Sequence, residues 1–254
     1  MILTSLLPGR RRIRRMIGTD GGGVRSVART HVGRIRTINE DRVFDSAARG
    51  LWAVADGMGG HSAGDIAAQT IVDSLRALAD DPARFDSDAI ETALVAAGQQ
   101  IHAKAAGSTR VSGSTIVALH IDGGDGTLFW AGDSRAYRAR AGRIDQLSRD
   151  HSLVQDLVDS GALAPAMADR HPQAHVITRA LGASANVAIE RRTITVEPGD
   201  IYLLCSDGLT RGHADPALLA YLGGPLDQIA EELLGDALAS GGADNISLVL
   251  IAVE

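Results

Sequence analysis

The chain has 254 residues, of which 45% are apolar and 22% charged, a composition that excludes wholesale disorder and suits one large domain. Its apolar runs all fall short of the roughly 18 residues that a membrane span needs. Residues 1–36 hold nine arginines and one acidic residue, which leaves 16 basic and 30 acidic residues in the rest, a net charge of −14. So acidic a body argues against nucleic acid as a partner, because the phosphate backbone would be repelled.

The N-terminal sequence MILTSLLPGRRRIRR places its apolar residues before its basic ones, the reverse of a secretory signal. The single cysteine excludes an internal disulfide framework and a cysteine-based zinc site. Both features favour a cytoplasmic protein. Three consecutive glycines, 21–23, separate a basic segment at residues 1–23, which we expect to be a flexible tail, from a single domain at residues 24–254.

The first half of this domain predicts strands, then helices, then more strands. Alternation over Val24–Val32 and the apolar run Leu51–Ala55 indicate strands. Apolar residues at helical spacing predict two amphipathic helices, Ala63–Leu78 and Asp88–Lys104. Four strands separated by Gly and Asp turns then predict a meander of hairpins: Ser114–Ile121, Thr127–Ala131, Ala136–Arg140 and Ile144–Leu147.

In the second half, His151–Ala168 predicts a helix or a helix pair, and Asp169–His175 a loop. The remaining expected elements are strands at Val187–Val196 and Ile201–Cys205, a helix at Pro225–Leu238 and a closing strand at Ile246–Val253. Strands come in groups with helices between them, without strict βαβ alternation. The fold class is therefore α+β, with antiparallel sheets covered by helices.

Acidic residues stand at the ends of apolar strands. Asp56, Asp133 and Asp207 each follow such a strand, and Asp244 precedes the closing one, while Glu40 and Asp41 precede a strand at 43–44. Carboxylates that the sheets bring together repel one another unless a cation intervenes. Carboxylate and backbone carbonyl oxygens are ligands that suit Mg²⁺, Mn²⁺ and Ca²⁺. The pattern therefore predicts a site for hard divalent metal ions, although any one Asp before Gly also fits a simple turn.

Other site classes fit poorly. The glycines after Asp56 miss a dinucleotide fingerprint because position 62 is serine, and a Walker loop is excluded because Lys104 is the only lysine. Cys205 and Arg211 match C-x5-R, the spacing of cysteine-dependent phosphatases, in which the loop amides and the arginine hold phosphate. Asp207 lies inside this loop and would repel a phosphate dianion. A strand end also suits a lone buried cysteine, so the cysteine nucleophile is the weaker alternative.

The chain resembles the metal-dependent protein phosphatase family, also called the protein phosphatase 2C family, in its short bacterial form. The resemblance runs from about Thr30 to Val253, and its motifs occur in the family's order. They are Gly33-x-x-Arg36-x-x-Asn39-Glu40-Asp41, Asp56-Gly57-Met58-Gly59-Gly60-His61, Ser112-Gly113-Ser114-Thr115, Gly132-Asp133-Ser134-Arg135, Asp150-His151, Thr178-Arg179-Ala180-Leu181-Gly182, Ser206-Asp207-Gly208 and Gly242-Ala243-Asp244-Asn245.

This resemblance implies a β-sandwich of two antiparallel sheets flanked by helices, with a flap at about residues 150–182. It also implies hydrolysis of phosphoserine and phosphothreonine with Mn²⁺ or Mg²⁺, two ions at the core and room for a third. The implied ligands are Asp56 bridging the core ions, Asp207 and Asp244 at the first, Gly57, Glu40 and Asp41 at the second, and Asp133 with Asp207 at the third. Arg36 would hold the substrate phosphate, and the ions would lower the pKa of an attacking water.

One departure from the family pattern affects the chemistry. Eukaryotic relatives carry a histidine directly after the Asp-Gly pair, where this chain has Met58. The general acid is therefore open among His61, His151, His175 and a water. The alternative to catalysis is a family member that only binds phosphoproteins. The expected partners are phosphorylated proteins, namely a Ser/Thr kinase and its substrates, and the chain is expected to be a monomer. The stretch LWAVADGMGGH is similar to phosphatases that oppose the kinase of type VI secretion systems.

Overall fold

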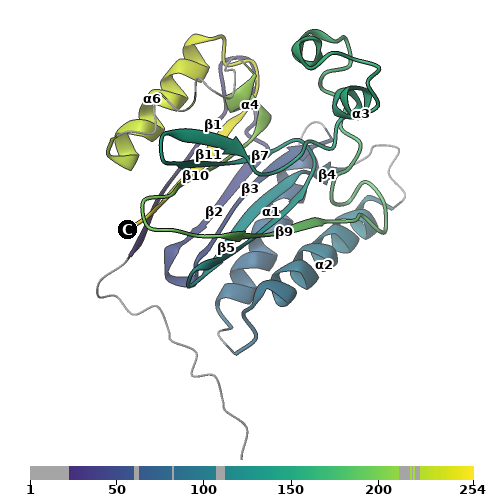
Figure 1. Ribbon diagram of the computed structural model, residues 1–254. Helices are drawn as coiled ribbons and strands as arrows, with labels where there is room; N and C mark the ends of the chain where they lie inside the picture. Colours follow the sequence, from purple (N-terminus) through teal and green to yellow (C-terminus); the bar gives the residue numbers. More distant parts are fainter. Residues whose placement is uncertain are drawn as a thin grey trace, which may run out of the picture.

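The computed structural model describes residues 23–59, 63–81, 83–106, 112–211, 218, 220 and 224–254, and within them the strands form two antiparallel sheets (Figure 1). The first sheet has the order β1-β11-β10-β7-β8. Its strands are β1 (Val24–His31), β7 (Arg135–Arg140), β8 (Arg143–Gln146), β10 (Ile201–Cys205) and β11 (Ile246–Val253). The second has the order β2-β3-β5-β6-β9, with β4 paired to β3. Its strands are β2 (Asp41–Ser46), β3 (Leu51–Met58), β4 (Gly113–Ser114), β5 (Ile116–Asp122), β6 (Asp125–Ala131) and β9 (Glu190–Thr195).

Helices cover the outer faces of both sheets (Figure 1). The second sheet packs against α1 (Ala63–Ala79) and α2 (Ser87–Ala105), and the first against α6 (Leu226–Ala239). The helical turn α4 (Asp207–Thr210) follows β10 directly. Two short helices, α3 (Leu153–Asp159) and the 3-10 helix η2 (Pro165–Arg170), extend away from the sheets in Figure 1, and η1 (Ala47–Arg49) joins β2 to β3.

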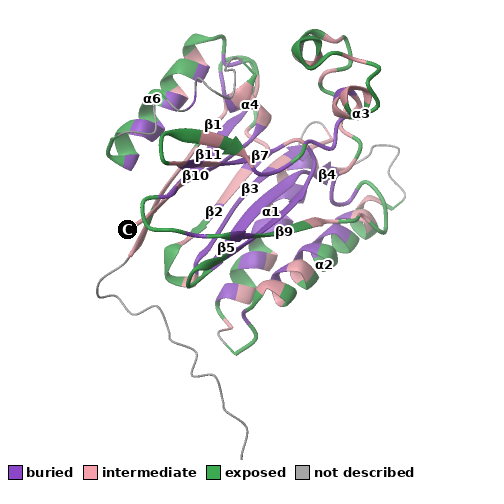
Figure 2. Cartoon of the chain, viewed as in Figure 1, coloured by how far each residue is buried: buried purple, intermediate pink, exposed green. Residues whose placement is uncertain are grey.

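Alternation along the central strands divides the core into three layers. In β3, Leu51 and Ala53 face the helices α1 and α2, whereas Trp52 faces the other sheet. In β11, Val249 faces the second sheet and Leu248 packs with α6. Figure 2 shows β3 and β5 buried along most of their length, because both of their faces are covered, while β9 is largely exposed. The sandwich is therefore four layers deep, helix-sheet-sheet-helix.

The structure confirms the expected α+β fold with two antiparallel sheets flanked by helices. It differs from the sequence expectation in local detail. The strand expected at Ser114–Ile121 breaks at Thr115 into β4 and β5. The amide of Thr115 bonds to the carbonyl of Asp56, the residue opposite it, but the amide of Asp56 donates to the side chain of Thr115 instead of its carbonyl. The expected strand at Val187–Val196 shortens to β9, and the helical segment at 151–168 is the pair α3 and η2.

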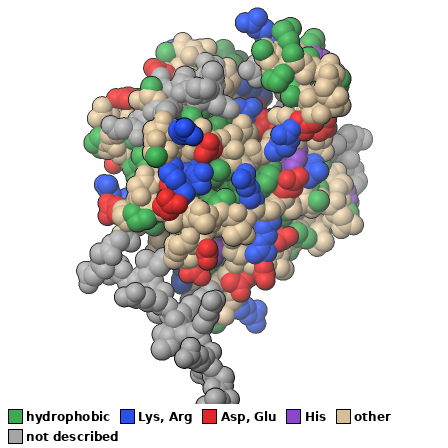
Figure 3. Space-filling view, in the orientation of Figure 1, with side chains coloured by type: hydrophobic (Ala, Val, Ile, Leu, Met, Phe, Trp, Pro, Cys, Tyr) green, Lys and Arg blue, Asp and Glu red, His purple; other side chains and the backbone are tan. Residues whose placement is uncertain are grey.

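Among the described residues, none of the helices is both long enough and apolar enough to cross a membrane. Residues 1–22 of the basic segment lie outside the described ranges, so the flexible tail stays a prediction. The surface of the body mixes both signs of charge. Figure 3 shows acidic and basic side chains interspersed over the viewed face.

Candidate metal centre

Strand register gathers the predicted carboxylates at one end of the sandwich. Asp41 opposes Asp56 across β2 and β3. In the other sheet Cys205, the last residue of β10, opposes Arg135 of β7 and Leu248 of β11. The remaining aspartates flank the ends of these three strands. Asp207 lies two residues after the end of β10, Asp133 two before the start of β7, and Asp244 two before the start of β11. Each sheet therefore delivers carboxylates to the same end, as the sequence predicted.

Asp41 is fully buried and joins the two sheets. Its Oδ2 accepts a hydrogen bond from Ser206 Oγ at 2.8 Å, and the amide of Ser247 in β11 donates to that same hydroxyl at 3.0 Å. Burial raises the pKa of Asp41 to about 6, and the nearby charges of Asp207 and Asp244 add to the rise. The serines fix the position of this carboxylate but leave much of its negative charge unbalanced.

Thr115 connects Asp56 to the segment that carries Asp133. Its Oγ1 accepts from the amide of Asp56 at 3.2 Å and bonds to Ser134 Oγ at 2.7 Å. Gly132, which precedes Asp133, has a φ of +116°, and a Cβ there would lie 2.6 Å from Thr115 Cβ. Burial raises the pKa of Asp56 well above its usual range, with Asp41 and Asp207 adding to the effect. Burial, with the charge of Asp207, raises the pKa of Asp133 to about 7.

Glu40 and Gly57 meet at the start of α1. The amide of Gly57 donates to the carbonyl of Glu40 at 3.2 Å. A Cβ on Gly57 would lie 2.2 Å from the carbonyl oxygen of Gly64, and a Cβ on Gly64 would lie 2.6 Å from Glu40 Oε1. Only glycine at both positions lets β3, the loop before β2 and α1 approach this closely. Burial raises the pKa of Glu40, partly opposed by the backbone of Gly64.

Two arginines bind the partly exposed carboxylates of Asp207 and Asp244. Asp244 Oδ2 accepts from Arg36 Nη2 at 2.9 Å and from Arg211 Nη1 at 2.8 Å. Arg211 Nη2 bonds to Asp207 Oδ2 as well. Burial raises the pKa of Asp207, although the guanidinium of Arg211 opposes this. Asn245 orders the loop that carries Arg36 and Glu40. Its side chain accepts from the amide of Glu40 at 2.8 Å and donates to the carbonyls of residues 32 and 38.

The carboxylates lie at one end of the sandwich, but they do not surround a single point at which an ion could bind. Within the part of the chain that the structure describes, no three His, Cys, Asp or Glu side chains are already arranged to hold a single metal ion. Three buried carboxylate oxygens find no hydrogen-bond partner among the described residues: Glu40 Oε1, Asp41 Oδ1 and Asp207 Oδ1. Oxygens left in this state lack a donor or a cation, so the donor set fits hard divalent ions.

The geometry also bears on the C-x5-R spacing. Cys205 is fully buried within β10, between β7 and β11, and Arg211 binds two carboxylates. A buried thiol beside acidic groups is poorly suited to act as a thiolate nucleophile.

The three histidines considered as general acids differ in what the structure says of them. His61 lies outside the described residues. His151 is committed elsewhere, since its Nδ1 accepts from the amide of Gly132 at 3.1 Å and its Nε2 lies 3.1 Å from Glu190 Oε1. Burial lowers the pKa of His151. His175 is exposed in the segment after η2. The general acid therefore stays open.

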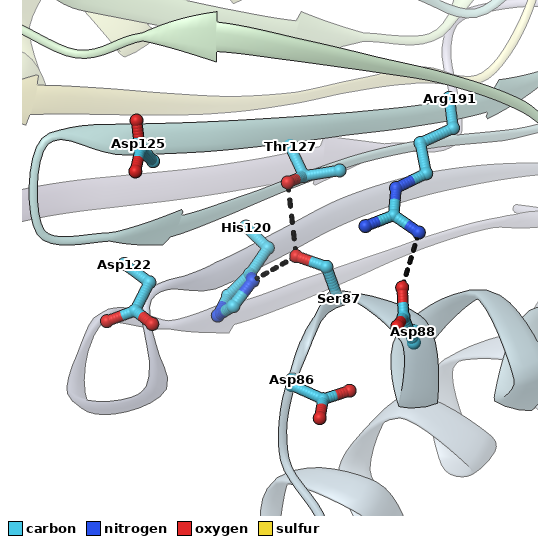
Figure 4. Close-up of a pocket in the computed structure, with 8 residues that line it drawn as sticks. All are labelled: Asp86, Ser87, Asp88, His120, Asp122, Asp125, Thr127 and Arg191. Atoms are coloured by element: carbon cyan, nitrogen blue, oxygen red, sulfur yellow. Dashed lines mark hydrogen bonds and ion pairs between the residues drawn. The ribbon is translucent and has the colours of Figure 1, made fainter. Parts of the chain in front are cut away.

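A separate depression of about 290 Å³ lies where the β5–β6 turn meets the start of α2 (Figure 4). Six of the eight side chains that line it have a bonding partner within the described part of the chain. Ser87 bonds to His120 and Thr127, Asp86 accepts from the amide of Ala89, and Arg191 pairs with Asp88. None of the predicted metal ligands lines it. These contacts anchor α2 to the sheet, and we assign the depression no chemistry.

Sequence reasoning gave no role to several residues that shape the site. Gly64 was missed, although a glycine in the first turn of a helix is a signal because glycine disfavours helix. Arg211 was weighed only as part of C-x5-R. Asn245 and Thr115 were quoted within motifs without a function. Their roles depend on contacts between distant segments, which spacing alone does not reveal.

The chain as a whole is similar in sequence and fold to known proteins. Residues 32–234 match a family model described as protein phosphatase 2C. The chain is 38% identical over 235 residues to the serine/threonine protein phosphatase PstP of Mycobacterium tuberculosis, an alignment covering 91% of this chain but 45% of that protein. The chain thus spans about half the length of that relative.

Two solved structures have the same fold. PppA, described as a key regulatory component of the type VI secretion system in Pseudomonas aeruginosa, has a TM-score of 0.81 at 36% identity, over 92% of this chain and all of that one. The catalytic domain of PstP in complex with two manganese ions has a TM-score of 0.81 at 35% identity, over 92% of this chain and 99% of that one.

Proposed function

The chain belongs to the protein phosphatase 2C family, and we propose that it is a metal-dependent phosphatase that hydrolyses phosphoserine and phosphothreonine in proteins. The observation that carries this proposal is the buried acidic cluster at one end of the sandwich, with three carboxylate oxygens left without a partner among the described residues. The two manganese ions named for the PstP structure support a binuclear Mn²⁺ or Mg²⁺ centre here.

We assign the ligands as the resemblance to the family implies. Asp56, whose pKa is raised by burial and by the charges of Asp41 and Asp207, would be shared by two ions. Asp207 and Asp244 would complete the first position; the Gly57 carbonyl, with Glu40 and Asp41, would serve the second; and Asp133 with Asp207 would form a third. All of these side-chain donors are carboxylates, and hard cations such as Mn²⁺ and Mg²⁺ are matched by oxygen ligands. When bound, the ions would neutralise the cluster and lower the pKa of an attacking water.

The protein's own residues then supply position and charge. The side chain of Arg36 is about half exposed, at 51%, and its guanidinium lies 2.9 Å from Asp244 at the edge of the cluster. From there it would hold the substrate phosphate by charge-assisted hydrogen bonds. Ser206, Thr115 and Asn245 fix the carboxylates before substrate arrives. Such preorganised charge is the main catalytic contribution available in phosphoryl transfer.

The substrates of this proposal are phosphorylated proteins, namely a Ser/Thr kinase and its targets. The similarity to PppA supports the kinase of a type VI secretion system as that partner. We propose that the protein acts in the cytoplasm as a monomer, with no nucleic acid bound. The segment at about 150–182, which includes α3 and η2, is proposed as the flap beside the metal centre.

The decisive experiment is hydrolysis of p-nitrophenyl phosphate and of a phosphothreonine peptide by the purified chain, with Mn²⁺ and with EDTA. We expect turnover with Mn²⁺ and none after chelation. Cys205→Ser is the matched test of the cysteine mechanism and is expected to retain activity within about twofold, because that thiol is buried inside β10.

Two outcomes would contradict the proposal. Turnover that survives EDTA but is lost in Cys205→Ser would replace the metal mechanism with the cysteine one. Tight Mn²⁺ binding without turnover of either substrate would instead indicate a family member that binds phosphoproteins without hydrolysing them.

A further inference from the structure

Arg211 occupies an unusual place in the acidic cluster. It lies directly after the helical turn α4, four residues beyond Asp207, so both side chains project from the same side of that turn. Its guanidinium bonds to Asp207 Oδ2 and, at 2.8 Å, to Asp244 Oδ2. These two carboxylates come from opposite ends of the chain segment between β10 and β11. One arginine therefore bridges both residues assigned to the first metal position.

The charge balance around Arg211 shows what this bridge does. Asp207 is mostly buried, with 16% of its side chain exposed, and Asp244 has 15%. Held close together without a counter-ion, two such carboxylates would repel each other strongly. Arg211 offsets part of that repulsion. The charges of Asp207 and Asp244 raise the pKa of Arg211 against the effect of its burial, so it stays cationic throughout.

A guanidinium and a divalent ion compete for the same oxygens. Asp244 already uses Oδ1 to accept from the amide of Asn245 and Oδ2 to accept from two arginines. A divalent ion held by Asp244 would lie close to the positive charge of Arg211, and the repulsion between the two cations would weaken binding of the ion. The side chain of Arg211 is 43% exposed, so its guanidinium can move into solvent when its contact with Asp244 breaks.

We infer that Arg211 is a built-in counter-cation for the first metal position, bridging Asp207 and Asp244 when no metal is bound and leaving Asp244 when the metal binds. This inference rests on the proposed function, because it takes these two residues as metal ligands. Its consequence is specific. Arg211 stabilises the metal-free protein and lowers the affinity of the first position for Mn²⁺, while the second position, formed by Glu40, Asp41 and Gly57, is little affected.

Arg36 does not serve the same purpose. Among the described residues its guanidinium bonds to Asp244 and not to Asp207, and it comes from the loop before β2 that Asn245 holds in place. Removing Arg36 would leave the Asp207–Asp244 bridge intact. The two arginines on one oxygen therefore separate into one that faces substrate and one that balances the ligands.

The test is Mn²⁺ titration of the chelator-treated full chain by calorimetry, with electron paramagnetic resonance to count free Mn²⁺. Arg211→Gln keeps the size and polarity of the side chain and removes its charge. We expect one of the two binding steps to tighten by about tenfold in this variant, with the other unchanged within about twofold. Arg211→Lys keeps the charge but loses the fork that spans two carboxylates, and is expected to fall between Arg211→Gln and the parent.

Thermal unfolding of the same proteins gives an independent readout. Without metal at pH 8, Arg211→Gln should unfold at a lower temperature than the parent, and the difference should shrink when Mn²⁺ is saturating. Arg76→Ala is the charge-matched control. Arg76 forms an exposed pair with Asp73 near the far end of α1, so its loss should change neither the affinity nor the effect of Mn²⁺ on stability.

Unchanged or weaker Mn²⁺ binding in Arg211→Gln would overturn the inference, because Arg211 would then support the loaded site instead of competing with it. If Arg211→Gln does not fold, Arg211→Lys decides the question by the same comparison. Asp207→Asn separates this failure from that of the proposed function. If Asp207→Asn binds Mn²⁺ like the parent, the ligand assignment itself is wrong; if it loses one binding step while Arg211→Gln shows no gain, only the inference about Arg211 fails.

Discussion

The two ends of strand β10 hold buried aspartates in opposite electrostatic states. Asp200, just before the strand, accepts from Arg140 Nε and Nη2 at 2.6 Å each, from Tyr202 Oη at 2.8 Å and from the amide of Glu197 at 3.0 Å. Burial alone would raise its pKa, but these donors hold the pKa of Asp200 below its usual range. Asp207, just after the strand, has a raised pKa because burial dominates, and its Oδ1 finds no partner among the described residues.

The comparison shows how one fold separates stability from function. At the Asp200 end every acceptor is supplied, so the carboxylate anchors the turn between β9 and β10. At the Asp207 end the chain gathers like charges and supplies too few donors. A folded protein tolerates such a shortage where another component completes the site, and an acidic cluster of this kind marks functional positions. Four predictions, from the largest expected effect to the smallest, test this difference.

Asp207→Asn should abolish Mn²⁺-dependent hydrolysis, with a loss of about a thousandfold or more, because it removes a ligand and its charge from the proposed metal centre. The metal-free protein should become no less stable at pH 8, since Asn resembles the protonated acid that burial favours. Steady-state kinetics with p-nitrophenyl phosphate and thermal unfolding in EDTA measure the two effects. Activity of the variant within tenfold of the parent would remove Asp207 from the site.

Asp200→Asn should have the opposite profile. It breaks a buried, bidentate ion pair with Arg140 and leaves donors unmatched, which should cost about 2–4 kcal/mol of unfolding free energy. For a domain of this size that corresponds to a fall in Tm of roughly 5–15 °C. Urea denaturation and calorimetry would measure it, with Asp145→Asn as control, because Asp145 forms an exposed pair with Arg138. A shift no larger than that of the control would contradict the contrast between the strand ends.

Acidity should act on the two ends with opposite sign. Asp41 and Asp133 have pKa values of about 6 and 7 in the folded, metal-free chain, above the value of about 3.9 for an unfolded Asp. The folded state therefore binds more protons between about pH 4 and 7, and stability falls as pH rises through that window. The pKa of Asp200 is lowered, so its contribution is present above about pH 3.9 and is lost only as pH falls further.

Thermal unfolding in EDTA checks this pH dependence. Tm should be higher at pH 5.5 than at pH 8 by several degrees, and Mn²⁺ should restore Tm at pH 8. Asp133→Asn should reduce the difference between the two pH values, because one of the responsible groups no longer titrates. Equal Tm values at both pH values in EDTA would mean that the cluster is already neutralised without metal.

Asn245→Ala should have the smallest effect of the four. It removes the hydrogen bond to the amide of Glu40 and two to the carbonyls of residues 32 and 38, so the loop that carries Arg36 loses its anchor to β11. We expect kcat/KM to fall by about tenfold, since positioning residues act through the groups they hold. The exposed Asn186→Ala is the matched control. A change no greater than in this control would show that the loop is held by other contacts.

The sequence by itself determined the fold class and the family. Grouped strands with helices between them predicted antiparallel sheets, and eight motifs in order named the family, which the comparison with protein phosphatase 2C confirms. It also picked out the acidic residues, because a carboxylate at the end of a buried strand is visible in the one-dimensional pattern. The ligand roles that it assigned to these residues remain predictions.

Only the tertiary structure decided how these residues share charge. The bridge from Arg211 to Asp207 and Asp244 joins the ends of two strands that are adjacent in the sheet but far apart in the sequence. The link from Asp56 through Thr115 to Ser134 likewise crosses three segments. Charge balance depends on distances between such segments, and spacing along the chain carries no measure of them. For this reason one strand, β10, can be flanked by Asp200, whose hydrogen bonds are all supplied, and by Asp207, which lacks donors. Only the packing of the sheets reveals this difference.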